Sequence, residues 1–147
     1  MTDHSPILAP IVALIGWTLV MWLWMYARRI PAMGKAGIDT KNLVGGNGAD
    51  LRARIPAKDQ WPADNYNHLM EQPTLFYAVA LVLALSGTGG GWNLCIAWAY
   101  VGLRIVHSLV QVTVNRVLVR FAIFALSTLC LMALTLHAAM KVFNLHG

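Results

Sequence analysis

Three features of the sequence predict an all-α fold, an integral membrane bundle of four spanning helices. Hydrophobic residues make up 58% of the 147-residue chain and charged residues only 12%, and the mean hydropathy is +0.58. A soluble domain carries about 25% charged residues, so most of this surface must face lipid. The apolar residues also gather into long segments, each able to cross a hydrocarbon core of about 30 Å. We expect residues 1–147 to form one such domain.

The first expected span covers about residues 7–27 and contains no charged residue. Aromatic side chains near its end are followed by Arg28 and Arg29, a pattern typical of a cytoplasmic membrane interface. Pro31 and the glycines after it are expected to end this helix. The N-terminus lacks the basic residues of a cleaved signal peptide, so we expect this span to remain in the mature protein.

A loop of residues 28–64 follows, and it holds seven of the eleven Lys and Arg together with four Asp. This mixture between apolar spans favours a cytoplasmic loop over a nucleic-acid-binding surface. The other spans are expected at about residues 65–86, 92–114 and 117–141, and their short connections make them antiparallel neighbours. The basic residues place the loop on the cytoplasmic side, so both termini are expected to face away from the cytoplasm.

Ionisable residues at membrane depth are costly and therefore mark candidate functional sites. Glu71, the only glutamate in the chain, lies in the first turns of the second span. Steps of three or four residues place one polar stripe on a single face of the third span, formed by Arg104, His107, Gln111 and Asn115. Arg116 and Arg120 begin the fourth span. The helical rise puts these groups in the same half of the membrane, where they can meet in one pocket.

The cations of this set outnumber its single acid, which leaves two roles open. The groups can neutralise one another as contacts between helices, or the surplus positive charge can bind an anionic ligand, which we favour. The planar guanidinium of arginine suits carboxylates, and an arginine beside a thiol favours the thiolate. Glutathione fits this inventory with two carboxylates, one thiol and an ammonium group that could meet Glu71, although other anionic metabolites fit as well.

The layout and these polar positions resemble the MAPEG family, the membrane-associated proteins in eicosanoid and glutathione metabolism. Residues 65–76 resemble the family's second-span signature, in which an Asn and a Glu lie one turn apart before a proline and aromatic residues. The segment from Arg104 to Arg120 is similar to that of microsomal prostaglandin E synthase-like members, which are the closest in pattern. The resemblance is weaker in the first span and the loop.

This resemblance implies a homotrimer of four-helix subunits that binds glutathione as a co-substrate in cytoplasm-facing clefts between subunits. Arg120 would be the catalytic residue, placed near the sulfur to stabilise the thiolate, and Glu71 would hold the glutathione ammonium. The other expected binding residues are Asn67, His68, Arg104, His107, Gln111 and Arg116, with Arg28 or Arg29 reaching in from the neighbouring subunit.

Three departures from the prostaglandin synthase pattern bear on catalysis. His68 replaces the asparagine expected one turn before Glu71, although Asn67 is adjacent. No tyrosine lies near Gln111, and Phe121 replaces a serine. The charged residues and the resemblance predict a glutathione-dependent membrane transferase or peroxidase for lipophilic electrophiles, whereas the departures remove hydroxyl donors that would position or activate the thiol. The alternative is a non-catalytic membrane subunit or binding protein that keeps the same scaffold.

Two further functions remain open on these residues. His68 and His107 could be axial ligands of a b-type haem across two spans. Glu71 could be the proton-coupled site of a small exporter, although four-span exporters carry their acid in the first span and this first span has none. Cys95 and Cys130 lack metal-ligand spacing, so no metal site is expected.

The expected partners are membrane lipids, a lipophilic substrate and further copies of the chain, with no nucleic acid. We expect a multi-pass protein of a bacterial inner membrane.

Overall fold

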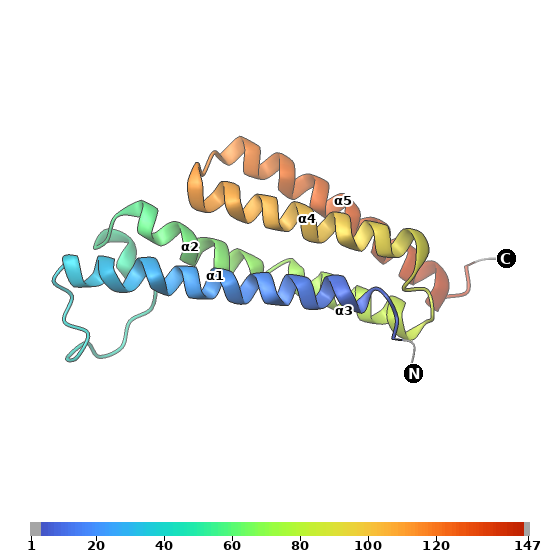
Figure 1. Cartoon of the computed structure of the whole chain (residues 1–147), viewed down its shortest axis with the longest axis horizontal. Coiled ribbons are helices and arrows are strands. Elements are labelled where there is room, and N and C mark those ends of the chain that lie inside the picture. Colours follow the sequence, from blue (N-terminus) through green and yellow to red (C-terminus); the bar gives the residue numbers. More distant parts are fainter. Residues whose placement is uncertain (1–3, 146–147) are drawn as a thin grey trace.

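The computed structural model describes residues 4–145, and its regular structure in this range is entirely helical (Figure 1). The elements are α1 (Leu8–Lys35), the short 3₁₀ helix η1 (Asp50–Ala53), α2 (Ala57–Leu69), α3 (Pro73–Leu85), α4 (Gly91–Thr113) and α5 (Val117–Val142). Four stretches are long and apolar enough to cross a membrane, and α2 and α3 together make the second of them. The prediction of an all-α bundle with four spans is confirmed.

The bundle is built from two layers of antiparallel helices (Figure 1). α1 packs along α2 and α3, while α4 and α5 form a hairpin that lies against the first layer. Residues 36–56 project from one end, which we call the loop end. The first and last described residues lie at the opposite end, which we call the terminal end. This even number of crossings places both ends of the described chain on the same side of the bundle.

The apolar core is formed mainly by α1, α3, α4 and α5. From α2 it includes only the last residue, Leu69. Phe76 of α3 stacks on Tyr100 of α4 with 4.5 Å between the ring centroids. The fully or nearly buried members of the core are Ile7, Ile11, Leu14, Met21, Leu69, Phe76, Ala80, Leu83, Ala97, Tyr100, Val101, Leu131, Leu134 and Ala138. α5 turns most of its apolar side chains outward, which suits a helix in contact with lipid.

α1 is longer than the sequence pattern predicts, because it continues through Pro31 to Lys35. Proline removes one backbone donor, and the acceptor that loses its partner is the carbonyl of Ala27. Ala27 and Pro31 are both exposed, so solvent can satisfy that carbonyl and the helix need not stop. α1 ends just before Gly37, whose φ of 66° is a left-handed conformation that glycine adopts without strain.

The loop is folded onto this extension of α1. A small apolar cluster holds it there, made of Ala32, Ile38, Leu51 and Ile55. In the glycine-rich turn at residues 45–48, the Asp50 carboxylate accepts a hydrogen bond of 2.7 Å from the backbone N–H of Asn47. Nearby, the side chain of Asn42 and the backbone N–H of Lys41 donate to Asp39 and lower the pKa of its carboxyl.

Candidate functional site

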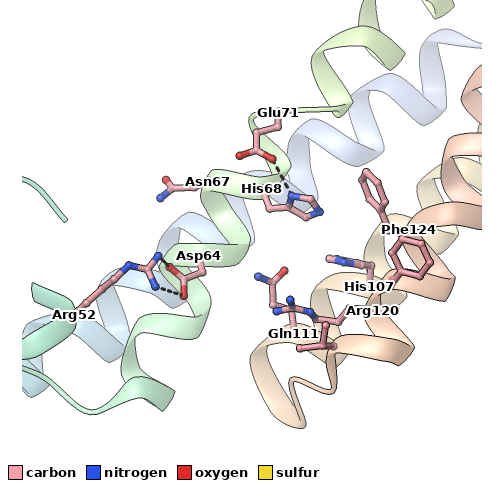
Figure 2. Close-up of a pocket in the computed structure, with 11 residues that line it drawn as sticks. Arg52, Asp64, Asn67, His68, Glu71, His107, Gln111, Arg120 and Phe124 are labelled. Atoms are coloured by element: carbon pink, nitrogen blue, oxygen red, sulfur yellow. Dashed lines mark hydrogen bonds and ion pairs between the residues drawn. The ribbon is translucent and has the colours of Figure 1, made fainter. Parts of the chain in front are cut away.

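A cavity of about 470 Å³ lies on the loop side of the bundle, between α2 and α5 (Figure 2). It is lined by side chains from η1, α2, the α2–α3 connection, α4 and α5. These are Arg52, Asp64, Asn67, His68, Glu71, His107, Gln111, Val117, Arg120, Phe121 and Phe124. We call this cavity the mixed-charge pocket, because acids and bases both line it.

A break in the second span places Glu71 at this pocket. Pro73 has no N–H and therefore cannot donate to the carbonyl of Leu69, so α2 ends at Leu69 and α3 starts at Pro73. Within the break, the backbone N–H of Glu71 donates to the His68 carbonyl at 3.3 Å. Thr74 donates its hydroxyl to the Glu71 carbonyl at 2.6 Å. The Glu71 side chain is left 70% exposed, so its carboxylate is available to a ligand.

His68 links the acid to the far wall of the pocket. Its Nδ1 lies 3.0 Å from Glu71 Oε2, and its ring lies 5.0 Å from that of His107, centroid to centroid. Figure 2 shows both imidazoles beside Phe124 of α5, whose centroid is 5.3 Å from that of His68. The two imidazoles thus lie beside each other on neighbouring spans, and the haem alternative of the sequence analysis stays a prediction.

Arg104 lies behind the pocket and is completely buried. Its Nη2 donates to the His68 carbonyl at 3.3 Å, and its guanidinium carbon lies 5.6 Å from the centroid of the Phe124 ring. In the break this carbonyl accepts the backbone N–H of Glu71 instead of a regular helical hydrogen bond, and its second lone pair accepts the Arg104 guanidinium. Arg104 Nε and Nη1 have no hydrogen-bond partner among the described residues.

Arg120 enters the pocket from the first turn of α5. Its Nη1 donates to Asn115 Oδ1 at 2.5 Å, and Asn115 adopts a left-handed backbone with φ of 52° in the α4–α5 turn. Asparagine tolerates this conformation better than most residues, so the turn both reverses the chain and holds the guanidinium. Arg120 Nε is buried without a partner among the described residues.

Several neutral polar atoms around the pocket are also buried without a partner in the described part of the chain. They are Nδ1 of His107, Oγ of Ser108, Oε1 of Gln111 and both side-chain polar atoms of Asn65. An unsatisfied buried polar group costs about 1–3 kcal/mol, so such groups cluster where a ligand or water completes them. His107, Ser108 and Gln111 follow the polar face of α4 that the residue spacing predicts, whereas Asn65 belongs to α2.

The structure brings together six of the residues that the sequence analysis expects at the site. They are Asn67, His68, Glu71, His107, Gln111 and Arg120. Arg104 is adjacent but does not line the cavity, and Arg116 is exposed just before α5. Arg28 pairs with Asp59 at 2.8 Å.

Arg29 likewise points to its own chain rather than into this pocket. Its Nη2 donates to Gln60 Oε1 at 2.9 Å.

Sequence reasoning missed two charged residues of the pocket. Arg52 of η1 and Asp64 of α2 form an ion pair at its rim (Figure 2). Both lie in the segment expected to be a solvated loop, and no helical periodicity connects residues 12 positions apart across a turn. The sequence shows only that basic and acidic residues are mixed in this segment, which does not indicate which pair faces a pocket.

Comparison with known proteins extends this description. A model of the MAPEG family matches residues 7–140, a range that includes nearly all of the described helices. The match is to the family as a whole and does not select its prostaglandin E synthase-like members. No curated protein and no solved structure matches the chain.

Proposed function

The chain belongs to the MAPEG family, and from this membership and the mixed-charge pocket we propose a glutathione-dependent membrane transferase or peroxidase for lipophilic electrophiles. One observation carries the proposal: the only glutamate of the chain and Arg120 of another span line the same cavity. Glutathione carries an ammonium, two carboxylates and a thiol, so it needs both signs of charge within one pocket. The volume of about 470 Å³ lies within the usual range of small-molecule sites, roughly 300–1,000 Å³.

In this proposal the acidic and basic side chains of the pocket bind different groups of glutathione. Glu71, already paired with His68, accepts the ammonium of glutathione. The guanidinium of Arg120 lies near the sulfur and stabilises the thiolate, which is the nucleophilic form. Arg52 offers a second guanidinium for a carboxylate, in exchange for its pairing with Asp64.

The chemical step needs no nucleophile from the protein. The thiol loses its proton to solvent, and the thiolate attacks the electrophilic carbon of the substrate, which forms a sulfur–carbon bond and expels the leaving group or opens a strained ring. With a peroxide, the thiolate attacks one oxygen, an S–O bond forms as the O–O bond breaks, and the departing alkoxide takes up a proton from solvent. A second glutathione then converts the sulfenic acid to the disulfide and releases water. A preorganised cation at a developing or resident anion typically contributes about 10²–10³ in rate.

The apolar part of the pocket favours a lipophilic second substrate. Phe121 and Val117 line it and are 65% and 70% exposed on the outer surface of α5. Side chains that are both lipid-exposed and pocket-lining offer a path from the bilayer to the thiolate. The pocket therefore has a polar side toward α2 and an apolar side toward α5.

A second candidate, a non-catalytic binding protein of the same scaffold, is favoured by one observation. No Ser, Thr or Tyr lines the pocket within the described residues. Gln111 and Phe121 stand where the resemblance leads one to expect hydroxyl donors. Such a pocket can bind glutathione while Arg120 alone supports the thiolate.

The proposed homotrimer would bring a neighbouring chain beside the pocket. For Arg28 to reach it, the pairing with Asp59 must open, and for Arg29 the bond to Gln60 must open. If Arg28 or Arg29 binds glutathione in the pocket of a neighbouring subunit, its present contact within its own chain must first break.

Calorimetric titration of glutathione into detergent-purified protein tests the proposal. Wild type is compared with Glu71→Gln and Arg120→Ala, and the exposed loop variant Lys41→Ala serves as a control that also removes one charge. We expect saturable binding in wild type and control and a loss in both pocket variants. Turnover of a generic electrophile in the same samples supports the enzyme, whereas binding without turnover supports the non-catalytic alternative. No binding at millimolar glutathione by folded wild type would overturn both.

A further inference from the structure

Another cavity, of about 250 Å³, lies at the terminal end of the bundle between the start of α4 and the last turns of α5, and its lining combines apolar surface with a few polar groups. It shares no residue with the mixed-charge pocket. Its lining consists of Thr88, Gly90, Trp92, Asn93, His137, Met140 and Lys141. We call it the terminal cavity.

Hydrogen bonds in this cavity determine which atoms remain available to a ligand. Asn93 Nδ2 donates to the Thr88 carbonyl at 2.9 Å, so the amide presents its Oδ1 to His137. His137 Nδ1 lies 2.5 Å from that oxygen and must therefore be the donor. Nδ1 is thus used in the structural contact between α4 and α5, whereas Nε2 has no such contact.

The charged side chains that line the terminal cavity within residues 4–145 are of one sign. Lys141 follows His137 by one helical turn and is exposed. No ion pair joins Lys141 to any described residue. Four of the five described acids lie in the loop or in α2, and Glu71 lies in the break between α2 and α3. No described carboxylate therefore neutralises this cavity.

The backbone at the cavity also favours an anion. Gly90 is the N-cap of α4 and supplies no side-chain hydrogen bond to the first turn. The first N–H groups of a helix have no intrahelical partner, and the helix dipole makes this end positive. Such N–H groups add to an anion site that a lysine and a histidine already define.

The surroundings of the cavity are those of a membrane interface. Trp92 lines the cavity and is 81% exposed, and Phe143, just after α5, is 71% exposed. Aromatic residues at helix ends gather at the level of lipid headgroups. A ligand there would meet cations on one side and aromatic surface on the other, which matches an anionic head joined to an apolar tail.

We propose that the terminal cavity binds the phosphate group of a membrane phospholipid, held by Lys141, His137 Nε2 and the first turn of α4. The volume is below that of usual ligand pockets and suits a headgroup rather than a whole lipid. Trp92 packs on the region where the headgroup meets the acyl chains. The site is independent of glutathione and of any transfer reaction.

The experiment uses delipidated wild-type protein in an uncharged detergent, titrated with short-chain phosphatidylglycerol and followed by native mass spectrometry. Lys141→Gln is the main variant, because its side chain is exposed and the change does not threaten the fold. His137→Gln keeps a donor for Asn93 and removes the imidazole. Lys41→Gln, which removes a charge from the loop end, is the matched control.

We expect wild type and Lys41→Gln to retain the lipid equally, and each terminal-cavity variant to bind it on the order of tenfold more weakly. Equal retention in all four proteins would overturn the proposal. Displacement of the lipid by inorganic phosphate at a concentration equal to that of the lipid would assign the cavity to free phosphate and would also overturn the proposal. Should His137→Gln unfold, the result for Lys141→Gln alone decides.

Discussion

The mixed-charge pocket and the terminal cavity differ in the charge of their described lining residues and in the hydrogen bonding of the buried atoms beside them. Arg52, Asp64, Glu71 and Arg120 give the mixed-charge pocket two bases and two acids. The terminal cavity contains a lysine and a histidine and no described acid. Charge of both signs suits a zwitterion with separated ends, whereas charge of one sign suits a simple anion.

The hydrogen bonds sharpen this difference. In the terminal cavity, Asn93 joins Thr88 to His137, so its amide is satisfied within the protein. Around the mixed-charge pocket, buried polar atoms of Asn65, Arg104 and neighbouring residues have no described partner. Since buried polar groups are nearly always bonded, the pocket has polar capacity that the chain alone does not use. The comparison therefore separates two kinds of site. A ligand of the terminal cavity must rely on Lys141, His137 Nε2 and backbone N–H groups, because the Asn93 amide is already used within the protein. A ligand of the mixed-charge pocket can also bond to buried atoms that have no described partner.

The largest expected effect follows from Arg120. Arg120→Ala should lower kcat/KM for a generic electrophile by about 10²-fold or more, because the thiolate loses its counter-ion. Lys141→Gln should leave turnover unchanged, since it lies in the other cavity. Steady-state assays with glutathione in excess measure both, and an equal loss in the two variants would contradict the separation of the cavities.

The next largest effect tests the acid of the mixed-charge pocket. Wild type should bind glutathione about tenfold or more tightly than its N-acetyl analogue, because a charge-assisted hydrogen bond contributes about 1.5–3 kcal/mol. Glu71→Gln should bind the two ligands almost equally. Calorimetry on the two proteins with each of the two ligands gives the coupling free energy between Glu71 and the ammonium group. If Glu71→Gln still prefers glutathione over the N-acetyl analogue, Glu71 does not bind the ammonium.

A smaller effect concerns the stability of the terminal end. A Cβ on Gly89 would overlap Ser5 Oγ and lie 2.7 Å from Ile7 Cγ2, so Gly89→Ala forces the N-terminal turn to move. We expect a loss of about 1–3 kcal/mol, seen as a lower apparent Tm in detergent. Gly102→Ala is the control, because nothing lies within 4 Å of the added methyl and helix propensity favours alanine.

The smallest effect is expected from the ion pair at the rim. Arg52 and Asp64 are 60% and 26% exposed, so Arg52→Gln should change stability by less than about 1 kcal/mol. Its effect on glutathione affinity should still exceed that of Arg54→Gln, a neighbouring exposed arginine that does not line the pocket. Matched thermal scans and titrations distinguish a binding role from a structural one.

Much of the fold could be predicted because hydropathy and helical spacing are local properties. Apolar segments of about 20 residues predict spans wherever they occur, and the positions of Arg104, His107 and Gln111 predict one polar helix face. The extension of α1 through Pro31 could not be predicted, because it depends on an exposed Ala27 carbonyl and on the loop that packs against the extension.

The sequence by itself determined the membrane class, the four spans and the polar stripe, since each depends on residues within a few turns of one another. Only the tertiary structure decided which acidic residues the polar stripe of α4 faces. It placed Arg52 beside Asp64, turned Arg28 and Arg29 toward α2, and buried Arg104 behind His68. These choices depend on how elements distant in sequence pack together, and no local periodicity contains that information.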